Sequence, residues 1–97
     1  MAAGQIRVTP EQMRTRATNF RTEGQNFDTV INKMQSLIDQ LQQEWEGQAS
    51  QQFAQQFAGL KPNFQKVRDL INEIGGQLDA TATSIEELDI QISQKFQ

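Results

Sequence analysis

The residues of this chain that could do chemistry are few, and the two most versatile types are missing. The chain has no cysteine and no histidine. It therefore has no thiol nucleophile, no thiolate metal site and no imidazole, which is the commonest general base and transition-metal ligand. Acidic side chains gather near the C-terminus at Glu86, Glu87 and Asp89, but no pair of carboxylates falls in a predicted pocket. We expect no catalytic residues, no metal, no cofactor and no small-molecule substrate.

Charge and hydropathy exclude further classes of partner. The 97 residues carry a net charge of −3, with a pI near 4.8. Because phosphate binding needs clustered Lys and Arg, we expect no nucleic-acid partner. No apolar run approaches the roughly 20 residues of a membrane span. The opening stretch "MAAGQIRVTPEQ" lacks the apolar core of a secretory signal peptide, so export would need a route that reads no cleavable signal.

The remaining candidates must be positioned by two long helices. In "TPEQ", Thr9 fits an N-cap, Pro10 the first helical position, and Gln12 completes a capping box. From Met13 to Trp45, apolar or small residues recur at alternating spacings of four and three. That spacing predicts an amphipathic helix over about residues 9–45.

A second stripe of the same kind predicts a helix over about residues 49–95. The stripe keeps its phase through Pro62, so we expect a kink near this proline and not a break. Gly75 and Gly76 disfavour the helix there. Either Gly76 permits the close approach of another helix, or the helix frays locally.

Between the stripes, the stretch "EWEGQA" holds the only tryptophan of the chain. Trp45 closes the first helix, and Gly47 can take the left-handed conformation that terminates a helix. We therefore predict a turn over residues 45–48 and an all-α helical hairpin, one domain spanning 1–97. The Trp45 side chain either plugs the end of the structure or is recognised by a partner, since interfaces favour Trp.

Pairing the helices about this turn places residue i beside about residue 94 − i. Arg7 then faces Glu86 and Glu87, Arg14 and Arg16 face Asp79, and Arg21 faces Glu73. Residues 1–22 hold four Arg and one acid, whereas residues 77–97 hold four acids and one Lys. The ends that lie together carry opposite charge, although exposed pairs contribute little each.

Two helices cannot cover stripes this wide, which leaves a long apolar surface. A second hairpin would cover it, and we predict an antiparallel four-helix bundle formed by a homodimer. A different partner with a matching stripe would satisfy the same physics. The predicted core consists of Phe20, Phe27, Ile31, Met34, Ile38, Leu41, Phe53, Phe57, Leu60, Phe64, Val67, Ile71, Ile74 and Leu78.

With "WEG" at Trp45 to Gly47 midway in such a hairpin, the whole chain resembles the WXG family, the early secretory antigenic target-like small proteins of type VII secretion. The resemblance implies export by a membrane-bound secretion ATPase complex of Gram-positive bacteria, often linked to virulence. It also implies a C-terminal export signal. The chain has no Tyr for the mycobacterial-type signal, but Ile85, Asp89, Ile92 and Phe96 match the form found in homodimeric members.

We therefore expect a secreted, non-enzymatic interaction protein that is a substrate of the secretion machinery, a carrier for other substrates, or both. The alternative is a membrane-permeabilising effector that opens its stripes onto lipid. Surface-active helices usually have polar faces rich in Lys and Arg, and here those faces are acidic and Gln-rich, which counts against that alternative. An enzyme would need a polar constellation that the sequence does not contain.

Overall fold

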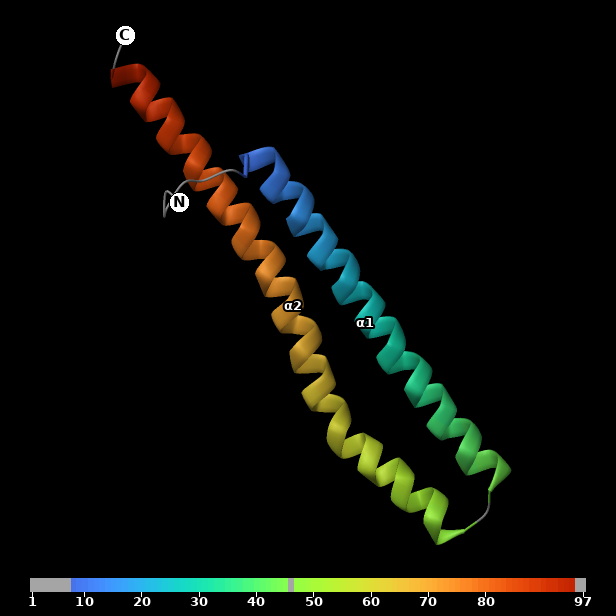
Figure 1. The fold of residues 1–97 in the computed structure, drawn as a ribbon. Coiled ribbons are helices and arrows are strands. Elements are labelled where there is room, and N and C mark those ends of the chain that lie inside the picture. The colour runs from blue at the N-terminus through green and yellow to red at the C-terminus, as the bar shows by residue number, and fades with distance from the viewer. Residues whose placement is uncertain (1–7, 46, 96–97) are drawn as a thin grey trace, which may run out of the picture.

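The structure, a computed structural model, describes residues 8–45 and 47–95. It consists of helix α1 (Pro10–Glu44) and helix α2 (Gln48–Lys95), and no strand lies in these ranges. The helices run antiparallel as a long rod measuring 76 × 24 × 18 Å (Figure 1). The predicted all-α hairpin is therefore confirmed.

Helix α1 begins with the capping box expected from "TPEQ". The Thr9 hydroxyl accepts a hydrogen bond from the Gln12 backbone N–H at 3.1 Å, and the Gln12 side chain accepts one from the Thr9 N–H at 2.9 Å. Pro10 occupies the first turn, where its missing N–H removes no helical hydrogen bond. Helix α2 is continuous through Pro62 and bends in its first half (Figure 1), as a proline inside a helix requires.

The turn differs from the expected left-handed helix cap. Helix α1 ends at Glu44, and its C-cap Trp45 is extended, with its N–H donating to the Leu41 carbonyl at 2.9 Å. Gly47 has a φ of +159°, far from the left-handed helical value of about +57°. Because Trp45 already terminates the helix, Gly47 instead directs the chain into α2, at a positive φ that favours glycine.

Small residues form the seam between the helices. Apart from Ser50 and Phe57 near the turn, the buried positions are mostly Ala and Gly, seven residues apart on each helix: Ala17, Gly24 and Ile31 on α1, and Gly75 and Ala82 on α2. A Cβ added at Gly75 would lie 3.0 Å from the Ala17 carbonyl oxygen, whereas one at Gly76 would meet nothing within 4 Å. The expectation for Gly76 was therefore wrong by one residue. Gly75 permits the close approach and Gly76 faces outward.

The hairpin alone buries only part of the core predicted for the four-helix bundle. Of its fourteen residues, only Ile31 and Phe57 are buried within the hairpin. Six are half-buried, and six are exposed: Phe20, Leu41, Phe53, Leu60, Val67 and Ile74. The hairpin alone therefore leaves much of each stripe uncovered.

Candidate functional site

The two sides of the hairpin differ in character. One heptad position of α1 holds Arg14, Arg21, Asp28 and Gln35, and the position before it holds Phe20 and Leu41. At 100° per residue, these two positions lie about 100° apart around the helix axis. One side therefore carries a polar edge and the other an apolar face. We define the apolar face as Phe20, Val30, Leu37, Leu41, Phe53, Leu60, Val67, Leu70 and Ile74, all of which are exposed in the hairpin.

The polar edge is held by contacts between the helices. Arg14 pairs with Glu86 and donates to the Thr83 hydroxyl at 3.1 Å, while Arg21 pairs with Asp79. Further along, Arg68 Nη1 lies 2.6 Å from Asp28 Oδ1. The opposite charge of the two ends thus meets as expected.

The partners differ in detail from the expected ones. Arg21 reaches Asp79 and not Glu73, and Arg14 reaches Glu86 as well as Asp79, at 3.9 Å. Side chains on a helix tilt toward its N-terminus, and on α1 that direction runs toward the C-terminal end of α2. Among the described residues, Arg16 forms no ion pair with Asp79, and Arg7 lies outside them.

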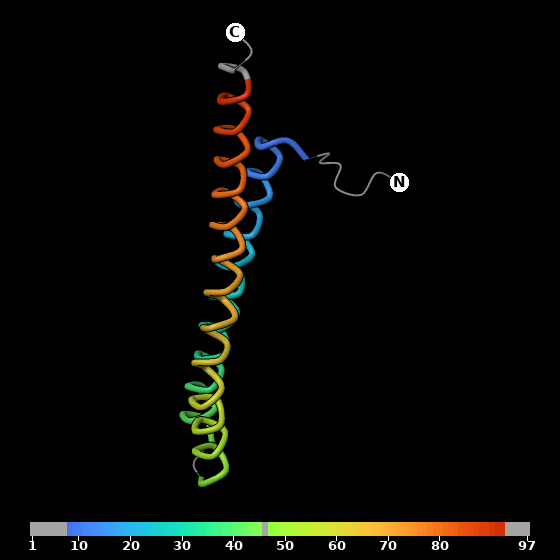
Figure 2. Tube along the Cα trace, turned by 90° about the vertical axis from the view of Figure 1, so that its left-hand side faces the viewer, coloured from blue at the N-terminus to red at the C-terminus, as the bar shows by residue number. Residues whose placement is uncertain are grey.

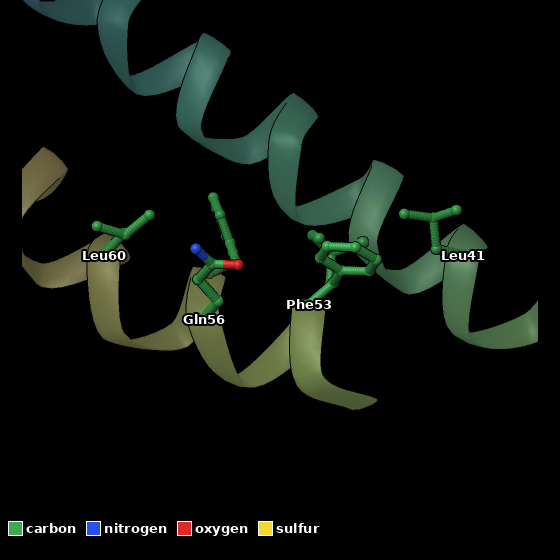
Figure 3. Close-up of a pocket in the computed structure, with 6 residues that line it drawn as sticks. Leu41, Phe53, Gln56 and Leu60 are labelled. Atoms are coloured by element: carbon green, nitrogen blue, oxygen red, sulfur yellow. The ribbon is translucent and has the colours of Figure 1, made fainter. Parts of the chain in front are cut away.

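At the opposite end from the termini, the apolar face is hollowed into a groove of about 280 Å³. Leu41 on α1 and Phe53 and Leu60 on α2 point into it, with Gln56 beside them (Figure 3). Ile38 and Phe57 complete the lining. A single water takes about 30 Å³ of liquid, so the groove has room for a large side chain.

Trp45 lies beside this groove at the turn. Its ring stands 6.2 Å from that of Phe53 between centroids, and 46% of the residue remains exposed. It therefore contacts α2 through one part of the ring and leaves much of the indole available. Gly47 and Ser50 lie next to it, and the Ser50 hydroxyl donates to the Gly47 carbonyl at 3.0 Å.

The positions predicted as an export signal lie on the part of α2 that extends beyond α1. Both views show this overhang (Figures 1 and 2). Ile85 is half-buried at its base, whereas Asp89 and Ile92 are exposed, with Ile92 at 46%. Phe96 lies outside the described residues. Within one hairpin the overhang and the Trp45 turn are at opposite ends, so the structure does not bring these two candidate sites together.

The described ranges hold no cluster of three or more His, Cys, Asp or Glu side chains that could bind a metal ion. Hydrogen bonds to Asp28 and Asp69 raise the pKa of Arg68, which keeps its charge in the polar edge. Neither helix, as far as it is described, is long and apolar enough to cross a membrane.

A comparison with known families shows which family this chain belongs to. The model of WXG100, described as proteins of 100 residues with WXG, matches residues 5–90. The chain belongs to the WXG100 family. The motif in the family's name is Trp45–Glu46–Gly47, so the exposed Trp and the positive-φ Gly of the turn are the two residues that it names.

WXG100 relatives match this chain over nearly its whole length. Protein YukE of Bacillus subtilis is 38% identical over 94 residues, 97% of each chain. Type VII secretion system extracellular protein A of Staphylococcus aureus is 30% identical over 91 residues, 94% of each chain. Geobacillus thermodenitrificans EsxA superposes with a TM-score of 0.80 at 39% identity, covering 92% of this chain and 97% of that one. The secreted protein EsxB of Bacillus anthracis gives 0.79 at 26% identity, over 92% and 99%.

Sequence reasoning missed the small-residue seam and the Asp28–Arg68 pair. The signal for the seam was present, because Ala17 and Gly24 on one stripe, and Gly75 and Ala82 on the other helix, are each seven residues apart. Counting large apolar residues gives such positions little weight, although close helix packing requires small ones.

Proposed function

We propose that this chain is exported by a type VII secretion system as a folded homodimer and acts through protein–protein contacts, without catalysis. The observation that carries the proposal is its full-length kinship with a type VII extracellular protein and with a secreted EsxB. The membrane-bound ATPase of that machinery is the proposed export partner, and the outside of a Gram-positive cell is the proposed destination. A carrier role for other substrates and a part in virulence extend the same proposal.

The apolar face supports the homodimer. Large exposed apolar side chains outnumber buried ones in the hairpin, where the buried apolar core is Ala17, Ile31, Phe57 and Ala82. A contiguous apolar surface of this extent marks an interaction site on a soluble protein. A second copy offers a surface of the same shape and hydropathy, which a four-helix bundle would bury. Sedimentation at micromolar concentration should give twice the chain mass of 11.0 kDa.

The half-exposed Trp45 supports recognition at the turn over an end plug. A plug of the hairpin itself would be buried, whereas 46% of Trp45 is exposed in the hairpin. Trp45→Ala should therefore leave helix content and dimer mass nearly unchanged while export falls, and Trp45→Phe should retain part of the export. Loss of the dimer in Trp45→Ala would instead support the plug.

The overhang supports a tail signal at Ile85, Asp89, Ile92 and Phe96. About eleven residues of α2 extend past the start of α1, roughly 16 Å of helix, and Leu88 and Ile92 there remain exposed. In an antiparallel dimer this tail lies near the turn of the other copy. The secretion machinery would then read a composite surface at each end of the bundle.

The decisive experiment is export in a Gram-positive host with and without the secretion ATPase. When the ATPase is deleted, the protein should be absent from the culture medium and should accumulate inside the cells. Deleting residues 88–97, or making Asp89→Asn, should have the same effect with the dimer intact. Glu87→Gln removes one carboxylate from the same exposed region and should be exported normally. Normal export of the truncated chain would exclude the tail as the signal.

A membrane-permeabilising role would use the same apolar face. Dye release from liposomes at neutral and acidic pH tests it, because a dimer that buries this face should release little dye at either pH. Release that is abolished by substitutions on the apolar face would favour the lipid-active alternative.

A further inference from the structure

We propose a register for the homodimer in which Phe20 of each copy enters the turn-end groove of the other, with Arg16 of one copy against Glu44 of the other. The groove is the one lined by Leu41, Phe53 and Leu60. This inference rests on the homodimer proposed above and specifies which residues meet in it.

The direction of the apolar face on α1 identifies the neighbouring helix. The line of Ala17, Gly24 and Ile31 faces α2, since these residues are buried in the seam. At 100° per residue, Phe20 lies about 60° round from Ala17, and Val30 lies about 100° round from Ile31 in the same sense. Their mean is about 80°, close to the right angle at which an adjacent helix lies in a four-helix bundle.

Symmetry then determines which helix that neighbour is. In an antiparallel dimer of hairpins, the two-fold axis runs across the bundle and sets each helix beside its own copy. Helix α1 therefore lies against α1 of the second copy, and α2 against α2.

The charges on the α1 face favour this antiparallel arrangement. Arg16 and Glu44 share the heptad position of Val30 and Leu37 and stand at opposite ends of the helix. A parallel pair would place like charges together, whereas an antiparallel pair places Arg16 near Glu44 of the second copy. The last turn of α1 has no basic residue, so the negative Glu44 stands uncompensated at the end of the helix dipole where a cation is favoured.

The same charges select the register. Pairing Arg16 with Glu44 centres the α1 contact at Val30. A shift by one heptad toward the turn would set Glu23 opposite Glu44, and a shift the other way would set Arg16 against Leu37. Centred near Val30, Phe20 lies level with Leu41 of the second copy, at the groove.

Helix α2 gives an independent centre at the same level. Its exposed apolar residues Phe53, Leu60, Val67 and Ile74 are symmetric about a point between residues 63 and 64. Gly75 contacts Ala17, and Asn72 lies over Gly24, which sets residues 30–31 of α1 level with about residues 63–64 of α2. One two-fold axis therefore satisfies both helices.

Phe20 has the properties that the groove needs. It is a large aromatic residue and 37% exposed in the hairpin, and it forms neither of the two aromatic pairs found in the described residues. The groove lining is apolar apart from Gln56. Buried aromatic anchors of this kind dominate interface energetics.

Cross-linking tests the register directly, because the chain has no cysteine of its own. In the double variant Phe20→Cys/Leu41→Cys, the two thiols of one chain lie about 31 Å apart along a single helix. A short bis-maleimide can therefore join them only between copies. The matched control is Thr22→Cys/Gln43→Cys, with the same separation on exposed positions of another face.

We expect a covalent dimer from the first variant and none from the control. Phe20→Ala should weaken the dimer about 100-fold, because two contacts are lost and each costs about tenfold. Arg16→Glu and Glu44→Arg should each weaken it several-fold, and the double variant should restore it. Asp39→Lys reverses a charge at an exposed position on the opposite side of α1 from Val30 and should leave the affinity within twofold of the wild type.

The outcomes separate this inference from the proposed dimer. A wild-type dimer in which Thr22→Cys/Gln43→Cys links and Phe20→Cys/Leu41→Cys does not would overturn the register and leave the dimer standing. A monomeric wild type at micromolar concentration would overturn both. A monomer that releases liposome dye only while Phe20 is present would make lipid the occupant of the groove, which also contradicts the inference.

Discussion

The adjacent glycines of α2 should respond oppositely to the same substitution. Alanine stabilises a helix interior by about 1 kcal/mol relative to glycine. At Gly76 the added Cβ meets nothing within 4 Å, so Gly76→Ala should gain most of that amount. At Gly75 the Cβ lies 3.0 Å from the Ala17 carbonyl oxygen and 3.3 Å from Arg21 Cγ. The backbone oxygen cannot swing aside, so the helices must move apart.

Overpacking of this kind costs about 1–3 kcal/mol. Gly75→Ala should therefore be neutral to about 2 kcal/mol less stable than the wild type, and about 1–3 kcal/mol less stable than Gly76→Ala. For a domain of this size, 1 kcal/mol shifts Tm by about 4–8 °C. Thermal unfolding followed by circular dichroism, at equal chain concentrations because a dimer's Tm depends on concentration, measures the difference. An equal rise in Tm for both variants would refute the close approach of α1 and α2 at Gly75.

Three further substitutions test other contacts. Thr9→Ala should lower stability by about 1 kcal/mol in urea unfolding, because it removes the capping-box acceptor, whereas Thr15→Ala in the same helix should change it little. Ile31→Asp should unfold or dissociate the protein in sedimentation, because Ile31 is 1% exposed and an unpaired charge would be buried in the seam; a stable dimer with Asp at this position would contradict the packing. Asp28→Asn should lower stability only slightly, and 1 M salt should remove even that effect, since the Arg68 pair is partly exposed.

The hairpin could be predicted from the sequence because the patterns that specify it are local. The capping box depends on residues three apart, and the stripes repeat every three or four residues, so each helix is specified within its own segment. The backbone conformation of Gly47 could not be predicted from the sequence. Whether Gly47 or Trp45 terminates α1 depends on which residue first leaves helical geometry, and both residue types permit the observed turn.

Contacts between the helices were predicted in register but not in detail. Counting from the turn brings the basic and acidic ends together, yet it treats every side chain as perpendicular to the helix. Arg21 instead follows the tilt toward the N-terminus of α1 and pairs with Asp79. The same count cannot distinguish Gly75 from Gly76, because only the rotation of α2 about its own axis decides which of them faces Ala17.

Different surfaces of the hairpin have different roles, so substitutions on each surface should have different measurable effects. The small-residue seam determines how closely α1 and α2 approach, and the paired charges of the polar edge favour one alignment between them. The apolar face remains exposed in the hairpin, and the overhang and the Trp45 turn contribute little to either set of contacts. Substitutions in the seam should therefore change the free energy of unfolding, and those on the apolar face the dimer affinity. Substitutions at the turn and the overhang should change export alone. A loss of export with normal Tm and normal mass would thus identify a recognition residue, whereas a loss that follows Tm would identify a packing defect.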